Sequence, residues 1–196
     1  MSIKKKIIAA VVVIALVITG KYIYDRHINH NFMTITDGKV YKSGVIPPDE
    51  IADYVKKYHI KSIVDLRFPG TGDDVNNPEV PSELKAEKEA VAKIPGVNYF
   101  NNGSDQVPQQ KNLDTFFKIM DNKANYPVLI HCFHGIGRAQ MYSAIYRIEY
   151  EGWDNEEARH QAAFPFMFSS FDDGKPKGEY LKNYKSRKQL KALGTK

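Results

Sequence analysis

The chain has 196 residues, a hydrophobic share of 42% and a formal net charge of +5 at pH 7. This length fits one domain with a short additional segment, and a single cysteine excludes an intramolecular disulfide. The positive charge favours an anionic partner. Much of it lies at the two ends, and no stretch matches a groove-reading motif, so we predict no nucleic-acid binding.

Residues 1–30 form a segment separate from the folded domain. Three lysines at positions 4–6 precede an unbroken apolar run from Ile7 to Ile18. Residues 7–24 would form about 27 Å of helix, just enough to span a bilayer. No Ala-x-Ala site follows, so we favour an uncleaved membrane anchor, with a cleaved signal peptide and a secreted or periplasmic product as the alternative. The lysines indicate a cytoplasmic N-terminus and a domain outside the cytoplasm, at the periplasmic face of the inner membrane.

The domain assigned to residues 31–171 begins with strands and helices in alternation. A hairpin over 33–41 turns at Asp37-Gly38. A helix starts near 47–50, and an apolar strand covers 60–66. The loop 68–81 is rich in Pro, Gly, Asn and Asp, so we expect it to be mobile. Ser82 is expected to cap a helix through Ala92, and a strand follows over 97–100.

The loop 101–110 follows a strand and contains Asp105. In a parallel sheet it opens on the same edge as any other loop that follows a strand. Pro108 then leads into a helix with apolar positions that include Leu113 and Phe117.

The most informative stretch is 127–144, which reads as strand, glycine loop and helix. Val128, Leu129 and Ile130 suit a buried parallel strand, and a helical pattern begins at Arg138. Such a junction directs backbone N–H groups and the positive end of the helix at one point, which makes an anion site.

Cys132 and Arg138 supply the chemistry at this junction. The helix end and the guanidinium favour the thiolate of Cys132, which makes it a nucleophile. The planar fork of Arg138 can hold two phosphate oxygens. The five loop residues between them are expected to bind substrate: Phe133, His134, Gly135, Ile136 and Gly137.

His131-Cys132-x-x-Gly135-x-x-Arg138 resembles the Cys-x5-Arg signature of the protein tyrosine and dual-specificity phosphatase superfamily. The resemblance implies an α/β fold with a central, mostly parallel sheet flanked by helices. It also implies metal-independent hydrolysis of phosphomonoesters through a phosphocysteine, without a cofactor. In this family an upstream loop aspartate protonates the leaving oxygen, and Asp105 is our choice, with Asp73 and Asp74 as runners-up. We expect His131 to hold the loop rather than act as a base.

One position departs from the family pattern. Ser or Thr usually follows the arginine and helps the thiolate to leave, but this chain has Ala139. We predict slowed breakdown of the phosphoenzyme. The departure also supports an alternative: a phosphate-binding pseudophosphatase without turnover. A sulfur-transfer or arsenate-reducing enzyme is a third option, which the lack of further cysteines disfavours.

The composition of the loop bears on the substrate. Members of the family it resembles that act on highly phosphorylated inositides often carry lysines in this loop, so the apolar Phe133 and Ile136 argue mildly against such a substrate. A domain outside the cytoplasm would meet a phosphorylated lipid or glycolipid, or a small phosphoester, more often than protein phosphotyrosine.

Residues 172–196 form a basic C-terminal tail. One interpretation is a frayed, solvated end. The other is a helix, with an apolar face from Tyr180 to Leu190, that touches an anionic membrane surface. For Arg147 and Trp153, upstream of the tail, we expect scaffold packing.

Overall fold

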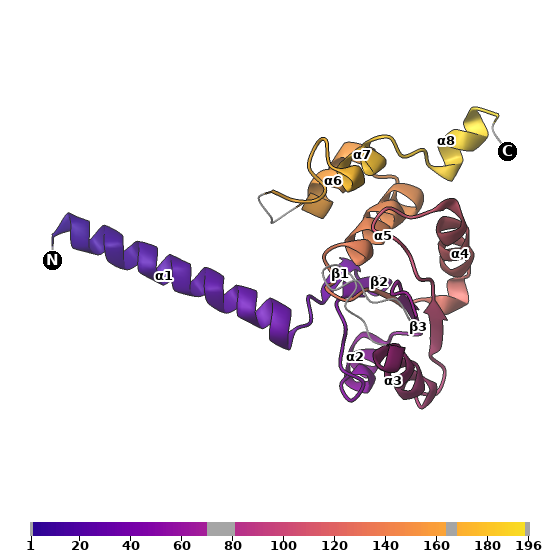
Figure 1. The fold of residues 1–196 in the computed structure, drawn as a ribbon, viewed down its shortest axis with the longest axis horizontal. Coiled ribbons are helices and arrows are strands. Elements are labelled where there is room, and N and C mark those ends of the chain that lie inside the picture. The colour runs from indigo at the N-terminus through magenta and orange to yellow at the C-terminus, as the bar shows by residue number, and fades with distance from the viewer. Residues whose placement is uncertain (1, 70–80, 164–167, 195–196) are drawn as a thin grey trace.

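The computed structural model describes residues 2–69, 81–163 and 168–194. A five-stranded sheet lies between helices on both faces (Figure 1), in the order β1-β2-β5-β3-β4. β1 is antiparallel to β2, and the other neighbours are parallel, which confirms the expected α/β fold. The strands are β1 Met33–Thr36, β2 Val40–Ser43, β3 Ser62–Asp65, β4 Asn98–Asn101 and β5 Val128–His131.

Alternation along the strands builds one apolar core on each face of the sheet. Val64 and Ile130 point into a core with helices α4 (Gln110–Asp121) and α5 (Arg138–Tyr146). Ile63 and Leu129 point into a second core with α2 (Ile51–Tyr58) and α3 (Pro81–Ala92). Helix α3 includes Pro81, so Ser82 lies inside the first turn rather than at the cap position that we predicted.

The parallel strands end level with one another. Ser43 and Asp65 both pair with His131, and Asp65 pairs with Asn101 on the other side. The loops after these four strands therefore open at one carboxyl edge, as expected for an α/β sheet. The loop after β3 contains the candidate acids Asp73 and Asp74. Its residues 70–80 lie outside the described residues, so our expectation that this loop is mobile falls outside them too.

The N-terminal segment is one long helix outside both cores. Helix α1 (Ile3–Ile23) has no buried residue and continues into a π-helical turn, η1 (Tyr24–Ile28). It extends away from the sheet in Figure 1 and is long and apolar enough to cross a membrane. A signal sequence would pass the same test, so the anchor remains a prediction.

The C-terminal part of the chain differs from the solvated tail that was one of our two expectations. Helix α7 (Pro176–Lys182) packs against α5 and α6 (Asn155–Ala163), and the side chains of Leu181 and Tyr184 are buried in the core. Helix α8 (Arg187–Ala192) follows, and Arg187 forms an ion pair with Glu149. A frayed end is therefore wrong for residues 176–187. Two short turns complete the described elements: η2 (Lys123–Asn125) and η3 (Arg147–Glu151).

Candidate functional site

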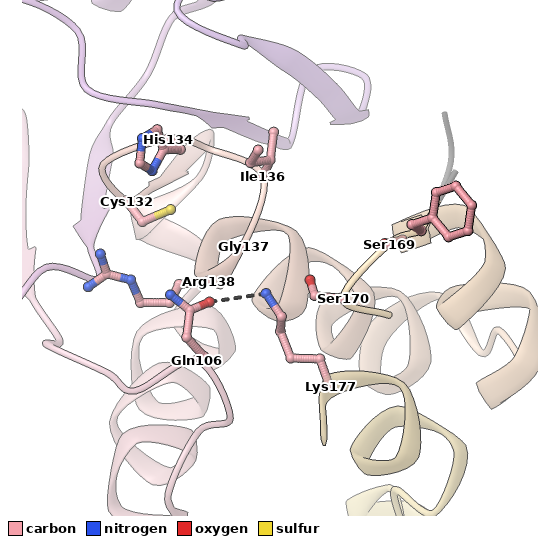
Figure 2. A pocket seen from close by; sticks show the side chains of 10 residues that line it. Gln106, Cys132, His134, Ile136, Gly137, Arg138, Ser169, Ser170 and Lys177 are labelled. Carbon is pink, nitrogen blue, oxygen red and sulfur yellow. Dashed lines mark hydrogen bonds between the residues drawn. The ribbon is translucent and has the colours of Figure 1, made fainter. Parts of the chain in front are cut away.

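A cavity of about 380 Å³ opens at the carboxyl edge of the sheet (Figure 2). The loop after β5 forms one wall of it. The loop after β4 contributes Gln106, and the segment that leads into α7 contributes the opposite wall. The lining residues are Gln106, Cys132, His134, Ile136, Gly137, Arg138, Phe168, Ser169, Ser170 and Lys177.

Three consecutive carbonyl groups fasten the loop after β5 to the scaffold. The carbonyl of Phe133 accepts from the Val45 N–H (3.0 Å), and that of His134 accepts from Asn31 Nδ2 (2.8 Å). The carbonyl of Gly135 accepts from Lys42 Nζ (2.9 Å). A loop with its carbonyls turned outward leaves its N–H groups for the inner side, which is the geometry of an anion nest.

Gly135 makes this loop possible. Its φ of 74° lies in the region that favours glycine. A Cβ at this position would collide with the backbone of Ser43 and Gly44, so no larger residue fits. The glycine lets the loop approach the backbone after β2 closely.

Cys132 and Arg138 are both buried, at the two ends of this loop. The backbone N–H of Ala139 donates to Cys132 Sγ at 3.5 Å. The Arg138 guanidinium donates to the carbonyl of Leu66 at 2.8 Å, which ties it to the end of β3. The sulfur thus lies at the start of α5, where backbone N–H groups and the helix dipole favour negative charge.

Two buried lysines lie close to this loop, and the sequence reasoning missed both. Burial lowers the pKa of Lys42 to about 8, although the nearby Cys132 opposes the shift. Burial also lowers the pKa of Lys177 in α7, again against the effect of Cys132. Lys42 stands in strand β2, and Lys177 stands in the stretch assigned to the tail, so only the fold brings them to the cysteine.

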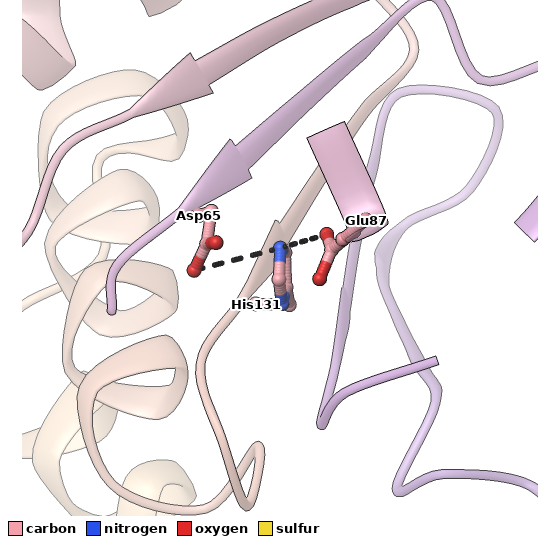
Figure 3. Close-up of side chains that lie close together, drawn as sticks. All are labelled: Asp65, Glu87 and His131. Carbon is pink, nitrogen blue, oxygen red and sulfur yellow. Dashed lines mark ion pairs between the residues drawn. The ribbon is translucent and has the colours of Figure 1, made fainter. Parts of the chain in front are cut away.

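His131 belongs to a buried ionic cluster behind the loop (Figure 3). Its Nε2 lies 2.9 Å from Glu87 and 3.7 Å from Asp65. Burial would lower the pKa of His131, but the two carboxylates outweigh it and raise that pKa. The Arg67 guanidinium lies against both carboxylates, so two cations face two anions.

This cluster brings together three groups of the kind that bind metals. One ligand atom from each of Asp65, Glu87 and His131 lies within 4.8 Å of the others. The sequence did not indicate this set because its members come from β3, α3 and β5. Arg67 already pairs with both carboxylates, so the arrangement fits an ion-pair network that supports the loop, the structural role expected for His131.

The structure gathers most, but not all, of the predicted site residues. Phe133 and Gly135 are absent from the cavity lining, and their carbonyls hold the loop instead. Asp105 is exposed and also absent from the lining, and its carboxylate accepts from Gln109 Nε2 at 2.8 Å. Its neighbour Gln106 lies in the cavity. Asp73 and Asp74 lie outside the described residues.

The packing around Arg147 agrees with the scaffold role expected from the sequence. Its guanidinium carbon lies 4.4 Å from the centre of the Trp153 ring, which is cation–π contact distance.

A family model described as "DSP-PTPase phosphatase fused to NAD+ Kinase" matches residues 23–173. The dual specificity protein phosphatase TpbA of Pseudomonas aeruginosa is 34% identical over 55 residues, which are 28% of this chain and 25% of TpbA. The match therefore spans about a quarter of the length of this curated relative.

Solved structures share the fold at low identity. The crystal structure of P. aeruginosa TpbA has a TM-score of 0.60 and 18% identity, over 85% of this chain and 92% of that one. The catalytic core of the S. cerevisiae PP-IP phosphatase SIW14 has a TM-score of 0.57 and 20% identity, over 84% and 90%. PTPMT1 in complex with PI(5)P has a TM-score of 0.55 and 18% identity, over 84% and 99%.

Proposed function

Because the chain belongs to the DSP-PTPase phosphatase family, we propose that it is a cysteine-dependent phosphomonoesterase that works through a phosphocysteine without a metal. The observation that carries this proposal is the placement of Cys132 and Arg138 in one cavity, at the two ends of a loop whose carbonyls are fastened outward. The nucleophile Cys132 and the anion-binding Arg138 and loop N–H groups then surround one site that can hold a phosphate group.

In the proposed first step, Cys132 Sγ attacks phosphorus and the bond to the leaving oxygen breaks. Arg138 and the loop N–H groups hold the equatorial oxygens, where charge accumulates. Asp105 gives a proton to the leaving oxygen. In the second step Asp105 takes a proton from water, which attacks phosphorus and releases the sulfur. The Asp105 carboxylate must leave Gln109 and turn toward the cavity for these transfers.

For the substrate, we propose a phosphorylated lipid or glycolipid, or a small phosphoester, outside the cytoplasm. The support is the exposed apolar helix α1 and the three lysines in its first turn, ahead of the apolar run. The solved relatives include TpbA with phosphotyrosine and PTPMT1 with PI(5)P, so both aryl and lipid phosphates belong in the screen. A compartment-sensitive reporter fused after Lys196 tests the location: a cytoplasmic signal contradicts it.

A phosphate-binding module without turnover is the second candidate. Two observations favour it: Asp105 lies outside the cavity lining, and Ala139 brings no hydroxyl to the sulfur. In this case the loop would bind phosphate or vanadate, and no phosphate would be released.

The test is phosphate release from an aryl phosphate by the full chain in neutral detergent micelles, without added metal. We expect Cys132→Ser to abolish turnover, and Asp105→Asn to lower kcat by about 10²–10⁴-fold, the usual contribution of a general acid. Asp114→Asn is the matched control, since Asp114 is also exposed and also accepts from a glutamine, Gln110.

Three results would decide against parts of this proposal. An inert wild type that still binds vanadate would favour the binding module. Turnover that survives Cys132→Ser would exclude the phosphocysteine. Equal activities of the Asp105→Asn and Asp114→Asn variants would show that the acid is another group.

A further inference from the structure

A second cation reaches the cavity from the C-terminal part of the chain. Lys177 is 8% exposed, and its Nζ donates to Gln106 Oε1 at 3.1 Å. The ammonium also lies 4.8 Å from the centre of the Phe171 ring. Figure 2 shows the Lys177 side chain approaching Gln106 from the side opposite the Arg138 guanidinium.

In the part of the chain that the structure describes, this ammonium group has no carboxylate partner. Within residues 2–69, 81–163 and 168–194, no carboxylate forms an ion pair with Lys177, and no acidic residue lines the cavity. By contrast, Lys182 on the same helix lies 3.5 Å from Asp173 and is exposed. A buried ammonium group without a carboxylate beside it is costly, so its position at a cavity points to an anionic ligand.

Lys177 and Gln106 stand directly against the end of the phosphate loop. A Cβ placed on Gly137 would lie 2.8 Å from Gln106 Oε1 and 3.4 Å from Lys177 Nζ. Ser169 and Ser170 also line the cavity. A volume of about 380 Å³ is in the range of small-ligand sites.

We propose that Lys177 and Gln106 form a second anion subsite beside the phosphate loop. The preferred substrate is then a phosphomonoester that carries a second anionic group, either another phosphate or a phosphodiester, a few bonds from the scissile phosphate. This inference rests on the proposed phosphatase function, because it assigns the scissile phosphate to the loop between Cys132 and Arg138.

The test compares two matched substrates in the full chain in neutral detergent micelles: fructose 6-phosphate and fructose 1,6-bisphosphate. We expect the wild type to prefer the bisphosphate, and Lys177→Met to lower kcat/KM for the bisphosphate by about tenfold or more. The same variant should change kcat/KM for the monophosphate less than about threefold, because Arg138 still holds that phosphate. Lys177→Arg should keep the preference.

Lys182→Met is the control variant, because Lys182 lies on the same helix but faces solvent. It should behave as wild type with both substrates. If Lys177→Met lowers kcat/KM equally for the two substrates, Lys177 serves the scissile phosphate and the second subsite is excluded. A wild type without preference for the bisphosphate also excludes it.

Binding separates this inference from the proposed function. Should the wild type release no phosphate even from an aryl phosphate, the phosphatase proposal fails by itself. Calorimetry with orthophosphate and fructose 1,6-bisphosphate then tests the subsite: weaker binding of the bisphosphate alone in Lys177→Met supports it, and unchanged binding of both overturns it.

A final comparison identifies the source of the second anion once the preference is established. Phosphatidylinositol 4-phosphate in phosphatidylcholine vesicles and its deacylated headgroup carry the same two phosphate groups. Dependence on Lys177 with the vesicles alone indicates a lipid substrate, and equal dependence with both indicates recognition of the soluble phosphates. If Lys177→Met lowers the activity with neither substrate, the subsite does not extend to phosphodiesters.

Discussion

Ala139 stands beside the cysteine sulfur. Its backbone N–H donates to Cys132 Sγ, and its fully buried side chain offers no hydroxyl. In the proposed second step the sulfur leaves as a thiolate, and a hydroxyl at this position would stabilise the developing charge. The sequence already singled out this residue, and the structure adds the contact through which a substitution would act.

We predict that Ala139→Ser speeds breakdown of the phosphoenzyme by roughly tenfold, the scale of one added hydrogen bond to a charged group. Rapid-quench kinetics with an aryl phosphate would show a burst in the wild type and a smaller burst with faster steady turnover in the variant. Ala144→Ser, which changes another buried alanine of α5, is the control. A wild type without a burst would contradict slow breakdown.

Lys42 gives a prediction about pH. Its pKa is lowered from 10.5 to about 8 by burial, so the unfolded chain binds more protons than the native one between these values. The free energy of unfolding should therefore rise with pH in this window. Relative to Lys42→Met, the wild type should gain about 2–3 kcal/mol between pH 7 and pH 10. Denaturant titrations at both pH values measure this gain, and a constant difference would contradict it.

Among the elements, α3 is joined to the sheet by charge as well as by its apolar face. Glu87 forms ion pairs with Arg67 and His131, and Tyr99 donates to Asp65 Oδ2 in the same cluster. The hydrophobic pattern located α3, β3 and β5, but it carried no information on which polar residues would meet between them. The cluster supports His131, and hence the start of the loop that holds Cys132.

We predict that Glu87→Ala lowers the free energy of unfolding by about 3–5 kcal/mol, because it leaves buried cations with one carboxylate fewer. Thermal or denaturant unfolding measures the loss. Glu89→Ala on the same helix should cost under about 0.5 kcal/mol, since Glu89 is 61% exposed. If Glu87→Ala lowers the free energy of unfolding as little as Glu89→Ala does, the cluster adds no stability.

At the scale of the whole molecule, the boundary between α1 and the domain lies near residue 29. Helix α1 buries nothing, but the carbonyl of His30 accepts from the Gly44 N–H, and Asn31 holds the loop after β5. The sequence placed the boundary at residue 30, where the apolar segment ends. The hydrogen bond between His30 and Gly44 shows that His30 belongs to the domain.

We predict that deletion of residues 2–28 yields a folded domain that no longer sediments with membranes and keeps activity on a soluble aryl phosphate within about twofold. Deletion of residues 2–31 removes Asn31 and should lower that activity further, by about tenfold, since the loop loses one fastening. Circular dichroism and flotation assays report folding and membrane binding. An unfolded product of the shorter deletion would contradict an independent domain.

The sequence by itself determined the succession of strands and helices along the chain, the apolar N-terminal helix and the pairing of Cys132 with Arg138, because all three follow from local periodicity and short spacing. The tertiary structure decided the features that depend on contacts between residues distant in the sequence. It brought Lys177, which lies in the segment expected to be a tail, to the wall of the cavity. It also placed Lys42 against the loop after β5 and gathered Asp65, Glu87 and His131 from three elements. It also left Asp105 outside the cavity lining and its neighbour Gln106 inside it, a choice set by the path of a loop that no periodic pattern encodes.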